Sequence, residues 1–327
     1  MAWFFDARGC SMKSFAFVFP GQGSQSVGML DGWEGHPAVA QTLQEASEAL
    51  GEDLGRLIGQ GPQEALALTT NTQPVMLVAG VAAWRVWRAE GGADPVALAG
   101  HSLGEYSALV AAGVLTLAQA VPLVRLRAAA MQEAVPLGTG AMAAILGLPA
   151  PRVIAGCAEA SAAFGAGSTE VVEAVNFNDP VQTVIAGTQA GVAKACALLK
   201  AAGAKRALPL PVSAPFHCSL MQPAAHKLRA ALAGITLASP AMAVVNNVDV
   251  AVRQDAAAIG QALYRQAFSP VRWVECVQAL QARGATHIVE CGPGQVLTGL
   301  TRRIAPELVG AALFDLATLA KTRELLA

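Results

Sequence analysis

The chain has 327 residues, of which 54% are hydrophobic and only 14% are charged, and its formal net charge is −1 at pH 7. Such an apolar chain could span a membrane, but its longest apolar runs contain Arg85, Glu105, Pro122 and Arg125, which suits buried helices better. The near-neutral charge gives no overall attraction for nucleic acid or for anionic membranes. We therefore expect a soluble, cytoplasmic, helix-rich α/β protein with neither of these partners.

The cysteines and the N-terminus carry no sign of export or of metal binding. The six cysteines form no CxxC pair and no ligand-like cluster, which predicts free thiols and no metal site. Residues 1–25 lack a charged segment followed by an apolar core, so they make a poor signal peptide. We expect translation to start at Met12, with residues 1–11 as a disordered N-terminal extension.

The first half of the chain alternates short strands with helices. A buried strand at 15–19 ends in a glycine-rich turn at 20–23, which exposes backbone N–H groups. A second apolar strand within 95–102 runs into glycine and is followed by a helical segment at 103–115. Three more helices are expected in this half, at 37–59, 72–91 and 116–134.

Residues 138–210 have a different character and contain a complete set of strands. The predicted order is β-α-β-β-α-β, which is the ferredoxin-like unit. After it the chain resumes the earlier pattern, and the strand at 286–292 runs into a second glycine-rich turn, as doubly wound sheets require. We therefore expect a large α/β-hydrolase-like domain, residues 12–137 and 211–327, with a ferredoxin-like small subdomain inserted in it.

The sequence Gly100-His101-Ser102-Leu103-Gly104 lies between the second predicted strand and its helix. This is the arrangement of a nucleophile elbow, in which the glycines allow a strained turn to hold Ser102 above the sheet. The N-terminus of the following helix can stabilise an oxyanion. An ordinary strand-to-helix turn with an N-capping serine would explain Ser102 alone.

A serine nucleophile needs a base, and two arrangements are open. His217 lies in a proline-broken loop just after the inserted subdomain, where its imidazole can project into a cleft between the two parts. No acidic residue lies close by in the sequence, so a backbone carbonyl is a candidate for orienting this imidazole. The alternative is a hydrolase triad in the usual chain order, made of Ser102, Asp249 and His287. We prefer Ser102 with His217.

Several motifs in a fixed order carry a family resemblance across nearly the whole chain. They are FVFPGQGSQ, GHSLGEYSALVAAGVL, MQEAVPLGTGAMAAILGL, VNFNDPVQTVIAG, AAGAKRALPLPVSAPFHCSLMQPAA, VVNNVDV and VECGPGQVLTGLT. Together they resemble the bacterial malonyl-CoA:acyl carrier protein transacylases of type II fatty acid synthesis. The resemblance implies an S-malonyltransferase that needs no cofactor and moves a malonyl group from malonyl-CoA to the phosphopantetheine thiol of acyl carrier protein. Ser102 would carry the malonyl group in a ping-pong reaction, and His217 would take its proton.

The resemblance also implies roles for residues outside the Ser–His pair. Gln22 and the backbone N–H of Leu103 would form the oxyanion hole, and the main-chain carbonyl of Gln266 would orient the histidine. Arg127 would pair with the malonyl carboxylate, which distinguishes a malonyl from an acetyl group. Without the resemblance, a solvated helix arginine would be the simpler interpretation of Arg127, and we expect it for Arg125, which lies on roughly the opposite face of the same helix.

One departure from the family pattern concerns the residue before the histidine. Many members that serve fatty acid synthesis have serine there, whereas this chain has Phe216, like acyltransferases of malonyl-selecting polyketide synthases. A bulky ring beside the malonyl α-carbon would exclude a methyl branch, and it leaves a polyketide carrier protein open as acceptor.

Two function classes besides the transferase remain as alternatives. They are a serine hydrolase that uses the same elbow and a non-catalytic module that binds a carrier protein. Basic residues of the inserted subdomain are candidates for contact with an acidic carrier protein, although a solvated charged face is the simpler explanation; these residues are Lys194, Lys200, Lys205 and Arg206.

Overall fold

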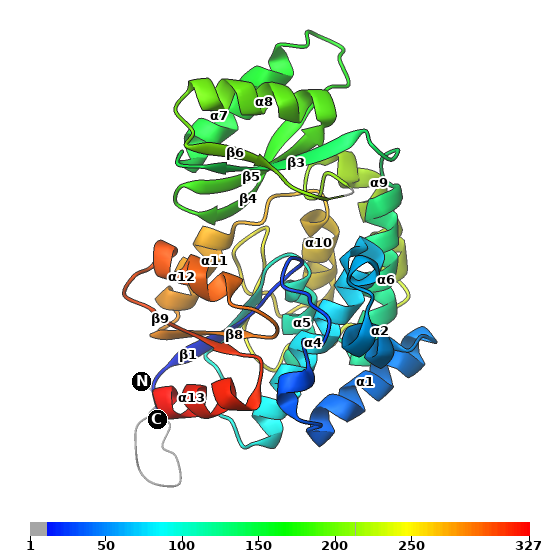
Figure 1. The fold of residues 1–327 in the computed structure, drawn as a ribbon, viewed down its shortest axis with the longest axis vertical. Helices are drawn as coiled ribbons and strands as arrows, with labels where there is room; N and C mark the ends of the chain where they lie inside the picture. The colour runs from blue at the N-terminus through cyan, green and yellow to red at the C-terminus, as the bar shows by residue number, and fades with distance from the viewer. Residues whose placement is uncertain (1–11, 213) are drawn as a thin grey trace.

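The computed structural model describes residues 12–212 and 214–327, and it contains two separate sheets (Figure 1). One is a five-stranded parallel sheet in the order β7-β2-β1-β8-β9. Its strands are β1 (Phe15–Phe19), β2 (Ala97–Gly100), β7 (Val244–Val245), β8 (His287–Cys291) and β9 (Val309–Leu313). The other is a four-stranded antiparallel sheet in the order β4-β5-β3-β6. Its strands are β3 (Gly140–Leu146), β4 (Val172–Asp179), β5 (Gln182–Thr188) and β6 (Arg206–Pro209).

The parallel sheet is covered by helices on both faces, which explains why every residue of β1 is buried. Phe15, Phe17 and Phe19 belong to the larger core, with the helices of the first half of the chain and α9 and α10. Ala16 and Val18 face a second core with α11 and α12. The helices around this sheet are α1 (Pro37–Leu50), α2 (Leu54–Gln60), α3 (Gln63–Ala67), α4 (Thr69–Ala89), α5 (Gly104–Ala111), α6 (Leu117–Glu133), α9 (Gln222–Leu232), α10 (Ala256–Gln266), α11 (Trp273–Ala282), α12 (Val296–Ile304) and α13 (Leu316–Leu326).

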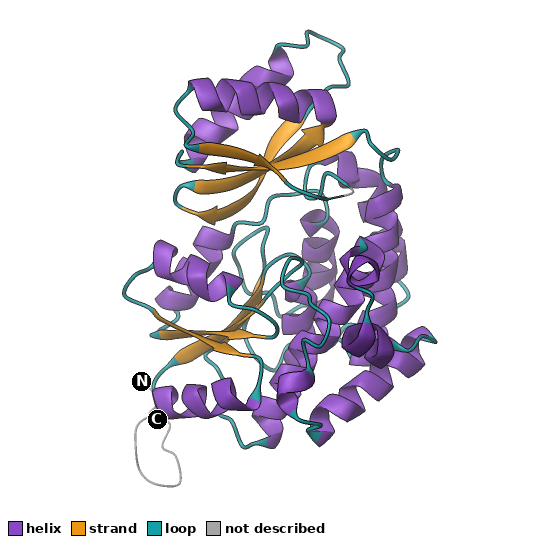
Figure 2. Cartoon of the chain, viewed as in Figure 1, coloured by secondary structure: helices purple, strands orange, loops and turns teal. Residues whose placement is uncertain are grey.

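The antiparallel sheet carries its own two helices, α7 (Ala150–Ala162) and α8 (Gln189–Ala201). Both pack on one face of the sheet around a third core, and the opposite face is turned toward the large part (Figure 2). The order β3-α7-β4-β5-α8-β6 and the strand order confirm the ferredoxin-like unit. We propose residues 138–210 as the small subdomain, and 12–137 with 211–327 as the large domain.

The helix predicted over residues 37–59 is wrong as a single element. It is interrupted at Gly51, which has a φ of 69° and ends α1 in the left-handed region that favours glycine. The side chain of Asp53 then accepts a hydrogen bond from Arg56 N–H and caps α2. The helix predicted over 72–91 runs from Thr69 to Ala89 and includes Pro74 in its second turn.

Several expectations concern absent features or residues beyond the description. Within residues 12–212 and 214–327 no helix is long and apolar enough to cross a membrane. In that same part of the chain no His, Cys, Asp and Glu side chains gather as metal ligands, and five of the cysteines are free. The predicted extension, residues 1–11, lies outside the described residues, and the cytoplasmic location stays a prediction.

Candidate active site

Ser102 lies in a sharp turn between β2 and α5, where its φ of 53° is rare for a residue with a side chain. The two flanking glycines allow this turn. A Cβ on Gly100 would lie 1.9 Å from the carbonyl carbon of Gly104, and a Cβ on Gly104 would lie 2.0 Å from the carbonyl oxygen of Phe19. The predicted order of strand, sharp turn and helix is therefore present, and the turn is packed against the end of β1.

The hydroxyl of Ser102 contacts the imidazole that we preferred as its base. Its Oγ lies 2.7 Å from Nε2 of His217, and Nδ1 of His217 lies 2.9 Å from the main-chain oxygen of Gln266 at the end of α10. If Nδ1–H donates to this carbonyl, Nε2 is left to accept the serine proton. Burial, together with the nearby charge of Arg127, lowers the pKa of His217 to about 3, so the imidazole is neutral.

Arg127 projects from α6 to the same serine and is almost completely buried. Its Nη2 donates to Ser102 Oγ at 3.1 Å and to Gln266 Oε1 at 3.0 Å, while Nη1 donates to Gln73 Oε1 at 2.6 Å. Such a guanidinium, held beside a nucleophile by neutral groups, is suited to bind an anionic substrate group.

Gln22 joins this group from the turn after β1. Its Oε1 accepts a hydrogen bond from Gln73 Nε2 at 3.4 Å, and its Nε2 donates to Thr69 Oγ1 at 3.4 Å. The structure thus brings together the side chains of Ser102, His217, Arg127, Gln266 and Gln22, with Leu103 next to the serine.

Two further residues, Asn247 and Glu105, hold the elbow in place, and the sequence analysis assigned a role to neither. Ser102 N–H donates to Asn247 Oδ1 at 2.8 Å, and Asn247 Nδ2 donates to Gly100 O at 2.7 Å. Oε2 of Glu105 accepts from Asn247 N–H at 2.9 Å and from Gln266 Nε2 at 2.8 Å. Gln266 Nε2 also donates to Ser102 O at 3.0 Å, so Asn247 and Gln266 hold the backbone of the serine, and Glu105 binds both of them.

Weak signals for the missed residues exist in the sequence. Gln73 is an amide directly before the apolar run 74–84 of its helix. Asn246 and Asn247 directly follow the short apolar segment 243–245, at the edge where strands of a parallel sheet end. Glu105 lies in the first turn of its helix, where an acidic residue is favoured by the helix dipole and attracts no notice.

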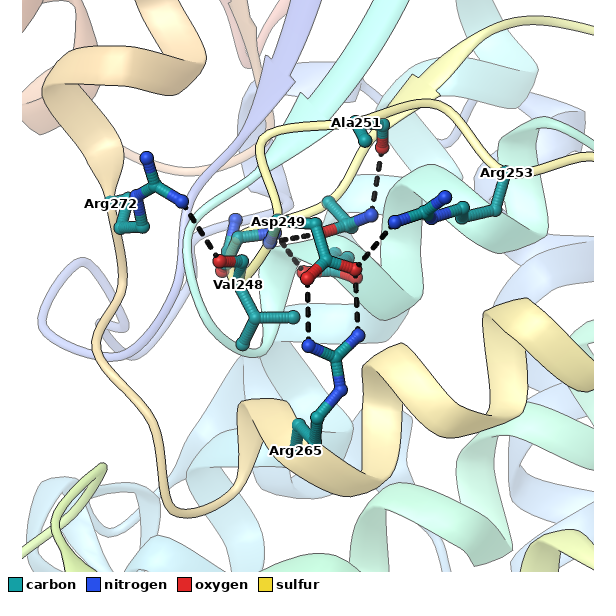
Figure 3. A network of polar contacts seen from close by, with 9 residues as sticks. Val248, Asp249, Ala251, Arg253, Arg265 and Arg272 are labelled. Carbon is teal, nitrogen blue, oxygen red and sulfur yellow. Dashed lines mark hydrogen bonds and ion pairs between the residues drawn. The ribbon is translucent and has the colours of Figure 1, made fainter.

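The alternative triad of Ser102, Asp249 and His287 is not assembled. Asp249 binds Arg265 through two hydrogen bonds of 2.7 Å and Arg253 through one of 3.1 Å (Figure 3). His287 is the first residue of β8 and is paired with Phe15, so it lies at the end of the sheet opposite the nucleophile. The alternative prediction of a hydrolase triad made of these three residues is therefore wrong.

Two neighbours of the site connect it to its surroundings. His101 Nε2 lies 2.9 Å from Oδ1 of Asn178 on β4, so the elbow touches the small subdomain. Arg125, expected to be solvated, instead binds Glu52 through two hydrogen bonds of 2.8 and 2.7 Å.

Known proteins share both the sequence and the fold. A family described as "Acyl transferase domain" matches residues 16–308, so this fold with its serine in the turn after β2 belongs to the class of acyltransferases. The malonyl CoA-acyl carrier protein transacylase of Salmonella typhimurium is 55% identical over 309 residues, which are 94% of this chain and 98% of that protein. The chain belongs to the malonyl CoA-acyl carrier protein transacylase family.

Solved structures agree closely with this assignment. The acyl-carrier-protein S-malonyltransferase of Burkholderia pseudomallei is 61% identical with a TM-score of 0.92, covering 95% of this chain and 99% of that one. A malonyl-transacylase solved in complex with a type II PKS acyl-carrier protein is 52% identical with a TM-score of 0.92, covering 96% of this chain and 100% of that one.

Proposed function

We propose that this chain moves a malonyl group from malonyl-CoA to the phosphopantetheine thiol of acyl carrier protein, for fatty acid biosynthesis, through a malonyl ester on Ser102. One observation carries the proposal. The hydroxyl of Ser102 is bonded at once to a neutral imidazole, at 2.7 Å, and to a buried guanidinium, at 3.1 Å. These groups combine a nucleophile and its base with a cation that can bind the free carboxylate of the malonyl group.

In the first half-reaction, Ser102 Oγ attacks the thioester carbonyl carbon of malonyl-CoA while His217 Nε2 takes the hydroxyl proton. The new C–O bond forms a tetrahedral oxyanion. When this intermediate collapses, the C–S bond breaks and His217 returns the proton to the thiolate of coenzyme A. In the second half-reaction, the carrier-protein thiol gives its proton to His217, its sulfur attacks the ester carbonyl, and the C–O bond breaks with the proton going back to Ser102.

Stabilisation of the oxyanion is assigned to Gln22 and to the backbone N–H of Leu103. Leu103 directly precedes the first residue of α5, where N–H groups have no acceptor within the helix. The turn that carries Gln22 lies beside the elbow, because a Cβ on Gly104 would lie 3.0 Å from Pro20 O. Donors from these two segments would face an oxygen bound at the serine.

Arg127 and Phe216 are assigned to the choice of acyl group. A malonyl carboxylate offers the guanidinium an anionic partner, which an acetyl methyl group does not. Phe216 is buried next to the catalytic histidine and would leave no room for a methyl branch on the α-carbon.

The carrier protein of fatty acid synthesis is proposed as the acceptor of the malonyl group. The four basic residues predicted as contacts are exposed on α8, β6 and the turn before β6, which suits an acidic partner; they are Lys194, Lys200, Lys205 and Arg206. A polyketide carrier protein is a second candidate, because Phe216 follows that pattern and one relative was solved with such a partner.

A transfer assay with radiolabelled malonyl-CoA and phosphopantetheinylated acyl carrier protein tests this function. We expect the wild-type chain to label the carrier protein, and Ser102→Ala or His217→Ala to lower the rate by roughly 10³-fold or more. Cys218→Ala is the matched control, because this buried thiol is adjacent to the histidine and burial raises its pKa to about 12. Transfer by Ser102→Ala at the wild-type rate would refute the proposal.

A further inference from the structure

Arg127 is a buried cation whose hydrogen-bond acceptors among the described residues are all neutral. They are the hydroxyl of Ser102 and the side-chain oxygens of Gln73 and Gln266. Because a charge removed from water is costly unless another charge compensates it, a nearby anion is required. Glu105 is a buried carboxylate whose charge interacts with that of Arg127.

Glu105 reaches Arg127 through one amide. Gln266 Nε2 donates to Glu105 Oε2 at 2.8 Å and to Ser102 O at 3.0 Å, and Gln266 Oε1 accepts from Arg127 Nη2 at 3.0 Å. Both amide protons therefore have acceptors, and the amide oxygen faces the guanidinium. The reversed amide would turn its N–H groups toward Arg127 and its oxygen toward the carboxylate, and both contacts would be repulsive.

We propose that Glu105 is a positioning residue that fixes the Gln266 amide against Arg127 and serves as the counter-charge of Arg127 while the acyl site is empty. The proposal rests on the function proposed above, in which Arg127 binds the malonyl carboxylate. That carboxylate would place a second negative charge on the same cation, one amide away from Glu105. The malonyl carboxylate and the Glu105 carboxylate then compete for the charge of Arg127, and protonation of Glu105 removes this competition.

The charges around Glu105 make this coupling observable near neutral pH. Burial raises the pKa of Glu105 to about 7, and its hydrogen bonds and Arg127 oppose the rise. The charged and titratable groups that face it are Arg127 on α6, Tyr106 on α5, Asp249 and Arg253 from the segment after β7, and Cys276 on α11.

None of the acidic groups among these neighbours titrates between pH 6 and 8.5. Hydrogen bonds from Arg265 lower the pKa of Asp249 to about 2, and burial raises the pKa of Tyr106 to about 12. Burial also raises the pKa of Cys276 above its usual value. Glu105 is thus the group that responds, and malonyl-CoA binding is expected to raise its pKa further and take up a proton.

Calorimetry of the Ser102→Ala variant tests this, because that variant lacks the hydroxyl that would be acylated and is expected to bind thioesters without reacting. Malonyl-CoA and acetyl-CoA are titrated at pH 7.5 in buffers of different ionisation enthalpy, so that the proton taken up per site is measured. We expect uptake of roughly 0.3–0.5 proton with malonyl-CoA and none beyond the shared coenzyme A background with acetyl-CoA. The malonyl-CoA Kd should rise roughly three- to tenfold from pH 6 to 8.5.

Adding Glu105→Gln should abolish both effects, because the amide oxygen keeps the acceptor while the titrating charge is lost. Glu290→Gln is the matched control, since this buried carboxylate lies on β8, which β1 separates from β2, and accepts from Thr298 N–H. Malonyl-CoA binding without proton uptake, or uptake that persists in Glu105→Gln, would overturn the role of Glu105 alone. Failure of Ser102→Ala to bind malonyl-CoA would overturn the proposed function and this inference together.

Discussion

At the level of single residues, the serine hydroxyl is controlled by an unusual pair of neighbours. A cation and an imidazole both contact Ser102 Oγ, and the charge of Arg127 is one of the forces that lower the pKa of His217. The imidazole is therefore neutral and ready to accept a proton at physiological pH. Burial lowers this pKa most, and the cation that would recognise the substrate adds to the effect, so both keep the base in its active form.

Arg127→Ala is expected to remove the preference for malonyl over acetyl groups. Loss of the charged hydrogen bonds to the substrate carboxylate should lower the ratio of malonyl to acetyl loading by roughly 10- to 100-fold. Loading of Ser102 from the two thioesters measures the ratio. Arg125→Ala is the control on the same helix, because this residue binds Glu52 instead. An unchanged ratio in Arg127→Ala would rule out its role.

At the level of elements, the site depends on a turn that tolerates no side chain at either glycine. Gly100 and Gly104 bring the end of β2, the start of α5 and the end of β1 into backbone contact. The close packing places the start of the helix under the serine. It is the structural reason that a strand and a helix can meet over only three intervening residues.

Gly104→Ala is expected to destabilise the fold by about 2 kcal/mol or more, because the new Cβ would meet the backbone of β1. Urea unfolding measures the change, and loading of Ser102 should fall with it. Gly59→Ala in α2 is the control, since nothing lies within 4 Å of its Cβ. There the free energy of unfolding should stay the same or rise by up to about 1 kcal/mol. Wild-type stability and loading in Gly104→Ala would contradict this account of the turn.

At the level of the whole molecule, the small subdomain is joined to the large part beside the nucleophile. Val271 N–H donates to Val175 O at 2.8 Å, and Phe177 N–H donates to Val271 O at 3.0 Å. Arg303 on α12 pairs with the buried Asp179 of β4 at 2.6 Å. Together with the contact between His101 and β4, these bonds set the small subdomain against the elbow.

The sequence was sufficient for features with a local pattern. The elbow was predicted because its strand, glycines and helix are contiguous, and the ferredoxin-like unit because its strands and helices follow one another. The single helix over 37–59 failed because Gly51 ends a helix through its own backbone, which periodicity does not detect. The choice of His217 and the roles of the more distant residues depended on the loop context and on the family resemblance.

The polar side chains that hold the serine backbone and Arg127 in place could not be predicted from the sequence. Asn247 contacts Ser102 across 145 positions, and Gln73 contacts Arg127 across 54. Such pairs depend on how helices and strands pack, and the side chains alone do not specify their partners. Glu105 was equally hidden, because its partners lie on two distant segments and an acidic residue in a first helical turn is common.

The central claim is that Ser102 carries the malonyl group between two thiols. Its most direct test incubates the chain with radiolabelled malonyl-CoA without carrier protein, digests it after acid quenching, and locates the label. We expect an ester on the peptide that contains Ser102 and little label from acetyl-CoA. In a second sample, phosphopantetheinylated carrier protein is added before the quench, and we expect the malonyl label to move to it. No label, label on another residue, or equal label from acetyl-CoA would contradict the claim.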